Sequence, residues 1–191
     1  MFITNSDPSA ELDVTLMIGG DKISVVAGPV LRETKWRGGQ YVMYATDPLG
    51  GEFMVEKSDG NAVAGFLMFQ SEDYLPPPPP FGTGPGSPQN YTSFQYTEGI
   101  GGQNVVTVVF GNCRAFFKIY ETRQLVGGVR TGPPAVYNLN DYLKISENGL
   151  LCNDSDAALA LAGVTDPVVV GICSAVPVAR NQFRLGLDQR L

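Results

Sequence analysis

The chain has 191 residues, of which 43% are hydrophobic and 17% charged, a composition typical of a folded globular protein with a buried core. Its 23 glycines and 14 prolines favour a turn-rich all-β chain over a helical one. The formal net charge is −6, and the basic residues are scattered except for Arg32, Lys35 and Arg37, which we interpret as a solvated or salt-bridged face. This distribution argues against a nucleic-acid-binding surface, which needs clustered positive charge.

The sequence contains no histidine. Histidine is the commonest general base and the commonest transition-metal ligand, so its absence removes Ser–His and Cys–His catalytic pairs. Chemistry based on carboxylates, lysine or tyrosine stays open. We nevertheless expect a protein that is not an enzyme, with no catalytic residues and no bound metal or cofactor.

Three cysteines, Cys113, Cys152 and Cys173, are far apart and lie in apolar surroundings. They read as small buried residues of a reducing compartment rather than as a disulfide framework or a zinc site. The N-terminal stretch lacks the basic and apolar segments of a signal peptide, and no apolar run approaches the roughly 20 residues of a membrane span. We therefore expect synthesis in the cytoplasm and no membrane partner.

The first half of the chain predicts a polar N-terminal arm over residues 1–10, followed by strands. The expected strands cover residues 12–18, 22–27, 40–46, 52–56 and 62–70. The first two flank Gly19 and Gly20, which should form a hairpin turn. The last strand is continuously apolar and should be buried on both sides.

Residues 76–90 are rich in proline and glycine and begin with five successive prolines. Such a run prefers a stiff extended conformation and cannot join a helix or a central strand. One interpretation is an exposed crossover between two β halves. The other is a recognition loop or a strap that reaches a neighbouring subunit.

The second half predicts further strands and one short helix. The strands should cover residues 91–96, 104–110, 114–122, 142–146, 150–152, 167–175 and 183–191. Gly111 with Asn112, and Asn148 with Gly149, should form tight turns. In the last strand Phe183, Leu185 and Leu187 should share one face.

Residues 153–156 carry carboxylates at alternate positions, which loosely suggests a calcium loop. The central glycine and distal glutamate of such a loop are missing. Capping of a helix over residues 157–162 by Asp154 or Asp156, with Gly163 as its stop, explains the pattern without a metal.

The two halves resemble each other faintly. Each has a strand beginning with tyrosine (Tyr41, Tyr142), a glycine turn, a return strand, and an apolar strand with a central glycine (Gly65, Gly171). This is either a pseudo-repeat or the ordinary pattern of β-hairpins. The central glycines suggest a bulge or a close backbone approach. We divide the chain into an arm (1–10), a first β half (11–75), a loop (76–90) and a second β half (91–191), the two halves forming one domain or two.

Other motifs are weaker. Glu72 and Asp73 could suggest a glycosidase pair, but adjacent residues of an extended chain point to opposite faces. The glycine-rich segments 82–86 and 98–102 lack the lysine and helix of a phosphate loop and read as turns. The sequon at residues 90–92 has meaning only in a secreted protein. A set of aromatic residues could form a sugar- or protein-binding face, or could belong to the core and subunit interfaces. The set is Trp36, Tyr41, Tyr44, Phe53, Tyr74, Phe81, Tyr91, Phe94 and Tyr96.

The C-terminal pattern carries a family resemblance. Residues 137–151 read Tyr-x-x-x-Asp-Tyr-Leu-Lys-Ile-Ser-Glu-Asn-Gly-Leu-Leu, residues 167–172 read Pro-Val-Val-Val-Gly-Ile, and residues 184–188 read Arg-Leu-Gly-Leu-Asp. This succession resembles the head decoration, or cement, proteins of tailed bacteriophages. The expected fold is an all-β sandwich or barrel, β-tulip-like, with long Gly/Pro-rich loops and at most one short helix.

The resemblance implies a virion structural protein that binds the outer surface of the capsid and stabilises the head. Its expected partners are the major capsid protein and further copies of itself, as a homotrimer. The arm (1–10) and the proline loop (76–88) become candidates for gripping neighbouring subunits. Two alternatives stay open: another virion component, such as a tail, connector or fibre protein, and a carbohydrate-binding β module.

Overall fold

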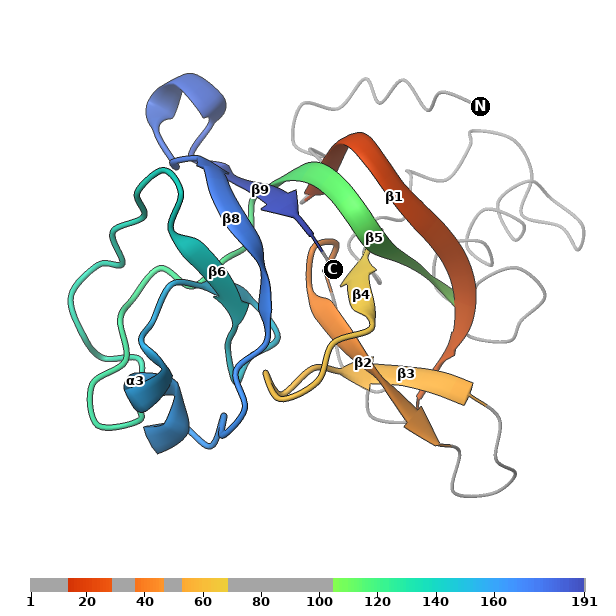
Figure 1. Ribbon diagram of the computed structural model, residues 1–191, viewed down its shortest axis with the longest axis horizontal. Coiled ribbons are helices and arrows are strands. Elements are labelled where there is room, and N and C mark those ends of the chain that lie inside the picture. Colours follow the sequence, from red (N-terminus) through yellow and green to blue (C-terminus); the bar gives the residue numbers. More distant parts are fainter. Residues whose placement is uncertain (1–13, 29–36, 47–52, 69–104, 191) are drawn as a thin grey trace, which may run out of the picture.

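The computed structural model describes residues 14–28, 37–46, 53–68 and 105–190 (Figure 1). The N-terminal arm, the proline loop and the strand expected over residues 91–96 lie outside the described residues, so these predictions stay open. Within the described part the fold is all-β with one short α-helix, as predicted. The strands are β1 (Val14–Ala27), β2 (Tyr41–Thr46), β3 (Phe53–Lys57), β4 (Gly65–Leu67), β5 (Val105–Phe117), β6 (Tyr142–Ile145), β7 (Leu151–Cys152), β8 (Val169–Ala175) and β9 (Leu185–Gln189). The helices are α3 (Asp156–Leu161) and the short 3₁₀ helix η2 (Ala179–Asn181).

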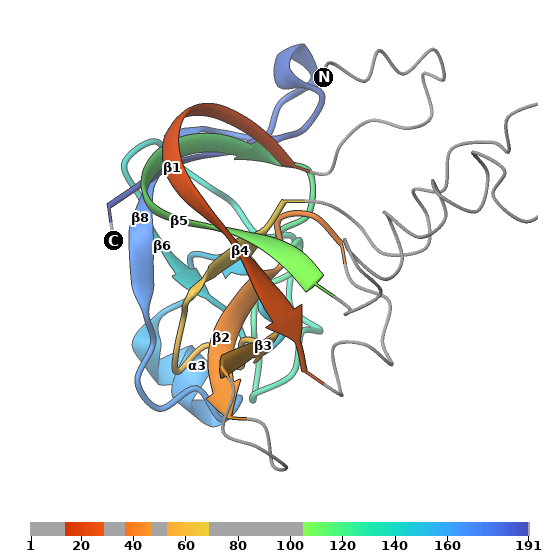
Figure 2. The same cartoon turned by 90° about the vertical axis from the view of Figure 1, so that its right-hand side faces the viewer.

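The nine described strands form one curled sheet in the order β1-β3-β2-β4-β5-β9-β8-β6-β7. Strand β1 also pairs with β5, so that β1, β3, β2, β4 and β5 close into a ring. Strand β5 continues beyond the ring and pairs with β9, which starts a second sheet of β5, β9, β8, β6 and β7. Figures 1 and 2 show the long β1 and β5 curving side by side, with β5 reaching from the ring to β9. The predicted barrel or sandwich class is therefore confirmed as a curled, barrel-like arrangement.

The two hairpin turns that we predicted at Gly19–Gly20 and at Gly111–Asn112 do not form. Strand β1 runs through Gly19 and Gly20, and β5 runs through Gly111, all three with positive φ (72°, 81° and 75°). The glycines lie at register shifts of the β1–β5 pair, where Gly19 opposes Cys113 and Asp21 opposes Phe110. Positive φ here produces bulges that bend both strands at the same place instead of reversing them.

The bend allows β5 to change neighbours. Before it, Val108 and Val109 pair with β4, and after it residues 113–117 pair with β9. One strand therefore belongs to both the ring and the second sheet, and β1 follows it along its length.

The largest apolar core lies between the ring and the second sheet. Tyr41, Phe66 and Phe117 form its aromatic centre, with ring centroids 5.0–6.1 Å apart. Leu143, Ile145, Leu185 and Leu187 are among the fully buried residues that cover this centre from the second sheet. A smaller cluster includes Val42, Val55, Leu67 and Val108 of the ring, and a third gathers Leu125, Cys152 and Val164 around Leu159 of α3.

The helix lies where it was expected, but its cap does not. The side chain of Ser155, not of Asp154 or Asp156, accepts the hydrogen bond from the backbone N–H of Ala158 (3.3 Å). Serine reaches the third following amide as well as aspartate does, so the sequence alone could not choose between them. Gly163 follows the last helical turn with φ +92°, as predicted for a helix stop.

The β6–β7 hairpin and β8 confirm the expected strands, and Gly149 (φ +70°) lies in the predicted turn. Two expectations need correction. Strand β4 contains only three residues, all buried, instead of the nine expected. Strand β9 begins at Leu185, while Phe183 has φ +56° and lies outside it. Leu185 and Leu187 face the core, but Phe183 does not share their face.

The two halves of the fold repeat one strand order and one register. The order β3-β2-β4-β5 in the ring matches β7-β6-β8-β9 in the second sheet. Val42 opposes Gly65 in the first half, and Leu143 opposes Gly171 in the second. The neighbouring pairs, Tyr41 with Phe66 and Tyr142 with Ile172, also correspond. The faint sequence similarity therefore reflects a repeated structural unit.

The central glycines have the same function in both units. A Cβ atom on Gly65 would lie 2.2 Å from the carbonyl oxygen of Val109, and one on Gly171 would lie 2.2 Å from that of Asp188. No side chain fits at such a distance. The predicted close backbone approach is confirmed at both positions.

Candidate interaction surface

The outer face of the second sheet, together with the adjoining part of β1, presents five residues in register, one from each of the strands β1, β5, β9, β8 and β6. They are Ile18, Arg114, Asp188, Ile172 and Tyr142. We call this set the cross-strand row. Along each strand, side chains alternate between the two faces, so the next residues point inward. Cys113, Leu187 and Leu143 accordingly lie in the core.

Tyr142 shows how this face differs from its counterpart in the first half. Tyr41 occupies the corresponding place in the repeated unit and is fully buried, whereas Tyr142 is 69% exposed. Ile18, at the other end of the row, is a large exposed apolar residue as well. In the first unit the equivalent face is covered by the second sheet. In the second unit no described segment buries Tyr142 as completely as the second sheet buries Tyr41.

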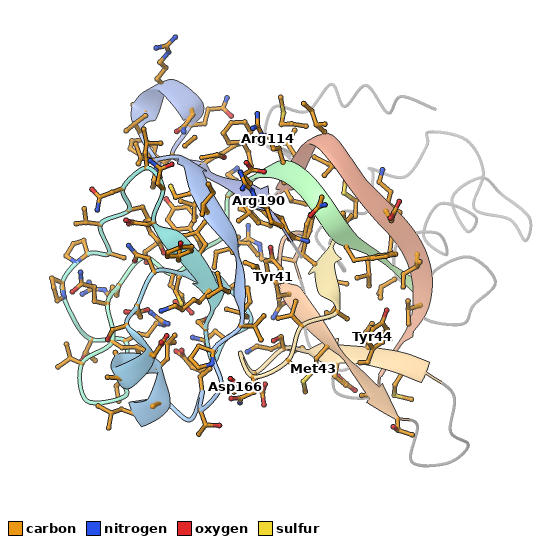
Figure 3. The ribbon with its side chains drawn as sticks, viewed as in Figure 1. Tyr41, Met43, Tyr44, Arg114, Asp166 and Arg190 are labelled. Carbon is orange, nitrogen blue, oxygen red and sulfur yellow. The ribbon has the colours of Figure 1, made fainter. Side chains whose placement is uncertain are left out.

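The centre of the row is charged. Asp188 lies 3.5 Å from the guanidinium of Arg114 and 3.3 Å from that of Arg190. Figure 3 shows both arginines beside β5 and β9. Two cations share one carboxylate, so this face carries local positive charge on a chain whose formal net charge is −6. Exposed ion pairs of this kind add little stability, and both guanidiniums stay accessible.

An open hollow of about 460 Å³ lies next to the row, between Ile18, Asn112 and the two arginines. The buried side chain of Gln189 contributes to its lining. Gln189 accepts a hydrogen bond from the Tyr41 hydroxyl (2.9 Å) and donates one to the carbonyl oxygen of Gly111 (3.0 Å). The lining of the hollow is thereby tied to the core, which gives this face a fixed shape.

The three cysteines are free and buried, as expected. Burial raises the pKa of the Cys113 thiol to about 11 and that of Cys152 to about 12, and it also raises the pKa of Cys173. A thiol acts as a nucleophile only when it is ionised. Near neutral pH these three groups therefore act as small apolar side chains.

A second cluster of charged residues surrounds Arg130. Its guanidinium lies 3.1 Å from Glu121, 2.9 Å from Glu147 and 2.8 Å from Asp154, with only 12% of the side chain exposed. Burial alone would lower the pKa of Arg130, but the hydrogen bonds that its guanidinium donates to Glu147 and Asp154, together with the charge of Glu121, outweigh burial and raise the pKa. The guanidinium thus remains charged among the three carboxylates.

This cluster connects segments that lack regular structure. Arg130 also donates to the carbonyl oxygen of Arg123 (2.9 Å), and Glu121 accepts from Ser146 (2.7 Å) and Asn148 (2.9 Å). The network therefore holds the irregular segment 121–134 against the β6–β7 hairpin. We assign it a structural function.

The residues that suggested a calcium loop have protein partners. Asp154 binds Arg130, Ser155 caps α3, and Asp156 lies 2.7 Å from the ammonium of Lys144. Among the described residues, no group of three or more Cys, Asp or Glu side chains is arranged to hold a metal ion. The prediction that this segment caps a helix is confirmed, but the capping residue is Ser155 rather than Asp154 or Asp156.

Most of the other candidates lie outside the described residues: Glu72 and Asp73, segments 82–86 and 98–102, the sequon at 90–92, Arg32 and Lys35. Of the aromatic set, Tyr41 is buried and Tyr44 is exposed on β2 (Figure 3). The backbone of Phe53 is described within β3, and the other members fall outside.

Sequence reasoning missed the cross-strand row. Alternation correctly separated Tyr142 from Leu143. No sequence signal links Ile18, Arg114 and Asp188, because pairing between distant strands aligns them.

A comparison with family models, curated proteins and solved structures finds no match to this chain. None of the helices in the described part is long and apolar enough to cross a membrane.

Proposed function

We propose that this chain is a structural binding protein that attaches to the outer surface of a phage capsid, without enzymatic activity. The observation that carries this proposal is the cross-strand row, a line of apolar, aromatic and charged side chains of which Ile18, Arg114 and Tyr142 are exposed, on a sheet with a fixed shape. Tyrosine and arginine are enriched in protein interfaces and dominate their binding energy. A surface of this kind is suited to adhesion.

The construction of the second sheet supports the same reading. Strands β5, β9, β8 and β6 each pair on both sides, and their inner face packs on the main core. The outer side chains are therefore held in place before a partner arrives, which reduces the entropy lost on binding. The resemblance of residues 137–151, 167–172 and 184–188 to capsid decoration proteins favours a capsid as the partner. A homotrimer would strengthen weak contacts through avidity.

The test is binding of the purified full-length protein to purified capsids assembled without it. We expect saturable binding with a fixed number of copies per capsid, measured by quantitative mass spectrometry and located by electron microscopy. Replacing Tyr142 by Ala should weaken binding about 10-fold or more, because truncated interface tyrosines commonly cost above 1 kcal/mol. Leu161→Ala is a matched control, since Leu161 is 71% exposed on α3.

Two results would contradict the proposal. Absence of wild-type binding at micromolar concentration would exclude attachment to the capsid. Location on the tail or the connector would identify the alternative virion component. A glycan array tests the carbohydrate-binding alternative. Tyr41, one of the aromatic residues considered for a sugar-binding face, is buried and is not accessible to a sugar.

A further inference from the structure

The loop between β8 and β9, residues 176–184, exposes an aromatic side chain at its end. Phe183 is 62% exposed, and Val178 on the same loop is also exposed. The alternation of the sequence predicts that Phe183 joins Leu185 and Leu187 in the core. The structure turns it away from them into the solvent.

An unfavourable backbone conformation produces this orientation. Gln182 and Phe183 have φ angles of +57° and +56°, two consecutive left-handed residues of which neither is glycine. Bulky side chains rarely adopt this region, and such residues persist only where surrounding contacts impose them. A simple extension of β9 by two residues would have avoided the strain.

A dense set of hydrogen bonds imposes the conformation. The side chain of Asn181 accepts from the N–H of Val178 (3.0 Å) and donates to the carbonyl oxygens of Val176 (2.8 Å) and Arg184 (3.0 Å). The N–H of Phe183 donates to the carbonyl oxygen of Val178 (2.9 Å), and the Tyr120 hydroxyl donates to that of Phe183 (2.9 Å). The loop is thus built to hold the ring outside the core.

We propose that Phe183 is an anchor residue that inserts into an apolar pocket with an acidic rim on the capsid protein, which deepens the proposed function and rests on it. The acidic rim follows from charge complementarity. Residues 176–187 include Arg180 and Arg184 and no acidic residue, and Arg180 is exposed on η2. A preorganised aromatic side chain that fills a pocket is the usual centre of a protein interface.

The open hollow beside the cross-strand row does not match the charge of this loop, so it does not favour a second copy of this chain as the receptor. The hollow next to Ile18 is lined by Arg114, Arg190 and Asp188. Its excess of arginine over acidic residues disfavours the approach of Arg180. Among the described residues this hollow is therefore a poor receptor for the loop, and we assign the loop to the capsid protein.

Phe183→Asn separates binding from stability, because asparagine tolerates left-handed backbone better than phenylalanine. We expect the melting temperature of Phe183→Asn to stay within about 2 °C of the wild type or to rise, because an exposed side chain contributes little to packing. Its affinity for purified capsids assembled without this protein should fall roughly 30-fold, as for a truncated hot-spot residue. Gln182→Asn is the matched control, since it changes the neighbouring left-handed residue and keeps the ring. It should bind like the wild type.

The outcomes separate the anchor from the proposed function. Loss of binding in Phe183→Asn alone, at unchanged melting temperature, supports the anchor. Wild-type affinity in Phe183→Asn, or a melting temperature lowered by more than about 5 °C, overturns it while wild-type attachment to the capsid still stands. If the wild type itself does not bind, both proposals fail. A weaker salt dependence of binding in Arg180→Gln would support the acidic rim, and an unchanged salt dependence would overturn it.

Discussion

The hydroxyl of Tyr41 donates a 2.9 Å hydrogen bond to the side-chain oxygen of Gln189, although 148 residues separate them in the sequence. Both side chains are almost completely buried. Gln189 also donates to the carbonyl oxygen of Gly111, at the bend of β5. One polar contact thus connects the ring, the second sheet and the strand that they share.

Removal of the Tyr41 hydroxyl should destabilise the protein. Tyr41→Phe leaves the Gln189 oxygen buried without its donor, which costs about 1–3 kcal/mol in the free energy of unfolding. Equilibrium urea unfolding measures the loss. Gln189→Met should cost a similar amount, and the double variant should lose less than the sum because the same contact is removed once. Additive losses would show that the two groups do not interact.

Arg130 should be the most sensitive charged residue in the described part of the chain. Arg130→Met leaves three carboxylates close together in a mostly buried position, and we expect a loss of about 3–5 kcal/mol. Arg123→Met is a matched control on the same segment, because Arg123 is exposed and makes one long bond (3.3 Å) to the carbonyl oxygen of Gly132. Its expected loss is below about 1 kcal/mol. Equal losses in the two variants would refute the structural function of the cluster.

The repeated glycines should tolerate no side chain. Gly65→Ala and Gly171→Ala each place a methyl group 2.2 Å from a backbone oxygen, which neither strand can move without breaking its pairing. We expect each to cost about 3 kcal/mol or more, or to prevent folding. Gly127→Asn is the control, because Gly127 has φ +59° and open space around it. Circular dichroism during thermal unfolding should show native behaviour for the control and loss of stability for both alanine variants.

Stability should fall at alkaline pH. The pKa of Cys152 rises from its ordinary value of 9.0 to about 12 in the folded protein, chiefly through burial, and burial also raises the pKa of Tyr41. Below about pH 9 the Cys152 thiol is protonated in both states, so its contribution to stability is fully present. Above that pH only the unfolded state releases the proton, and the contribution is lost as the pH rises toward 12.

For Cys152 alone this linkage amounts to about 1.4 kcal/mol per pH unit above pH 9. Urea unfolding between pH 7 and pH 10.5 should show a plateau followed by a decline. Cys152→Ala should be less stable at pH 7, because it leaves a small cavity, but should decline less steeply. An identical slope in the variant would exclude Cys152 as a source of the decline.

Local patterns in the sequence predicted much of the fold. Alternation identified β6 and the buried Leu143 and Ile145, and the apolar run of residues 167–175 identified β8. These predictions succeed because side chains alternate across a sheet whatever its partners are. The similarity of the two halves was also visible, since Gly65 and Gly171 face the same steric demand.

The glycines of β1 and β5 show why other predictions failed. A glycine with positive φ can lie in a tight turn or in a bulge. The sequence around Gly19 and Gly111 is compatible with either structure, so it could not distinguish them. The outcome depends on whether the two strands that flank them pair with each other or with a distant strand. Here they pair with a distant strand, and the glycines bend it.

Some features of the interaction surface follow from the sequence alone, and others depend on the tertiary structure. The sequence by itself determined the all-β class, the absence of histidine, the alternation that places Tyr142 opposite Leu143, and the positions where only glycine fits, because these follow from side-chain chemistry and local geometry. The tertiary structure decided that Ile18, Arg114, Asp188, Ile172 and Tyr142 form one row, since register between distant strands aligns them. It also decided that Phe183 leaves the core, because hydrogen bonds from Asn181 and Tyr120 impose a backbone conformation that its own preference would reject.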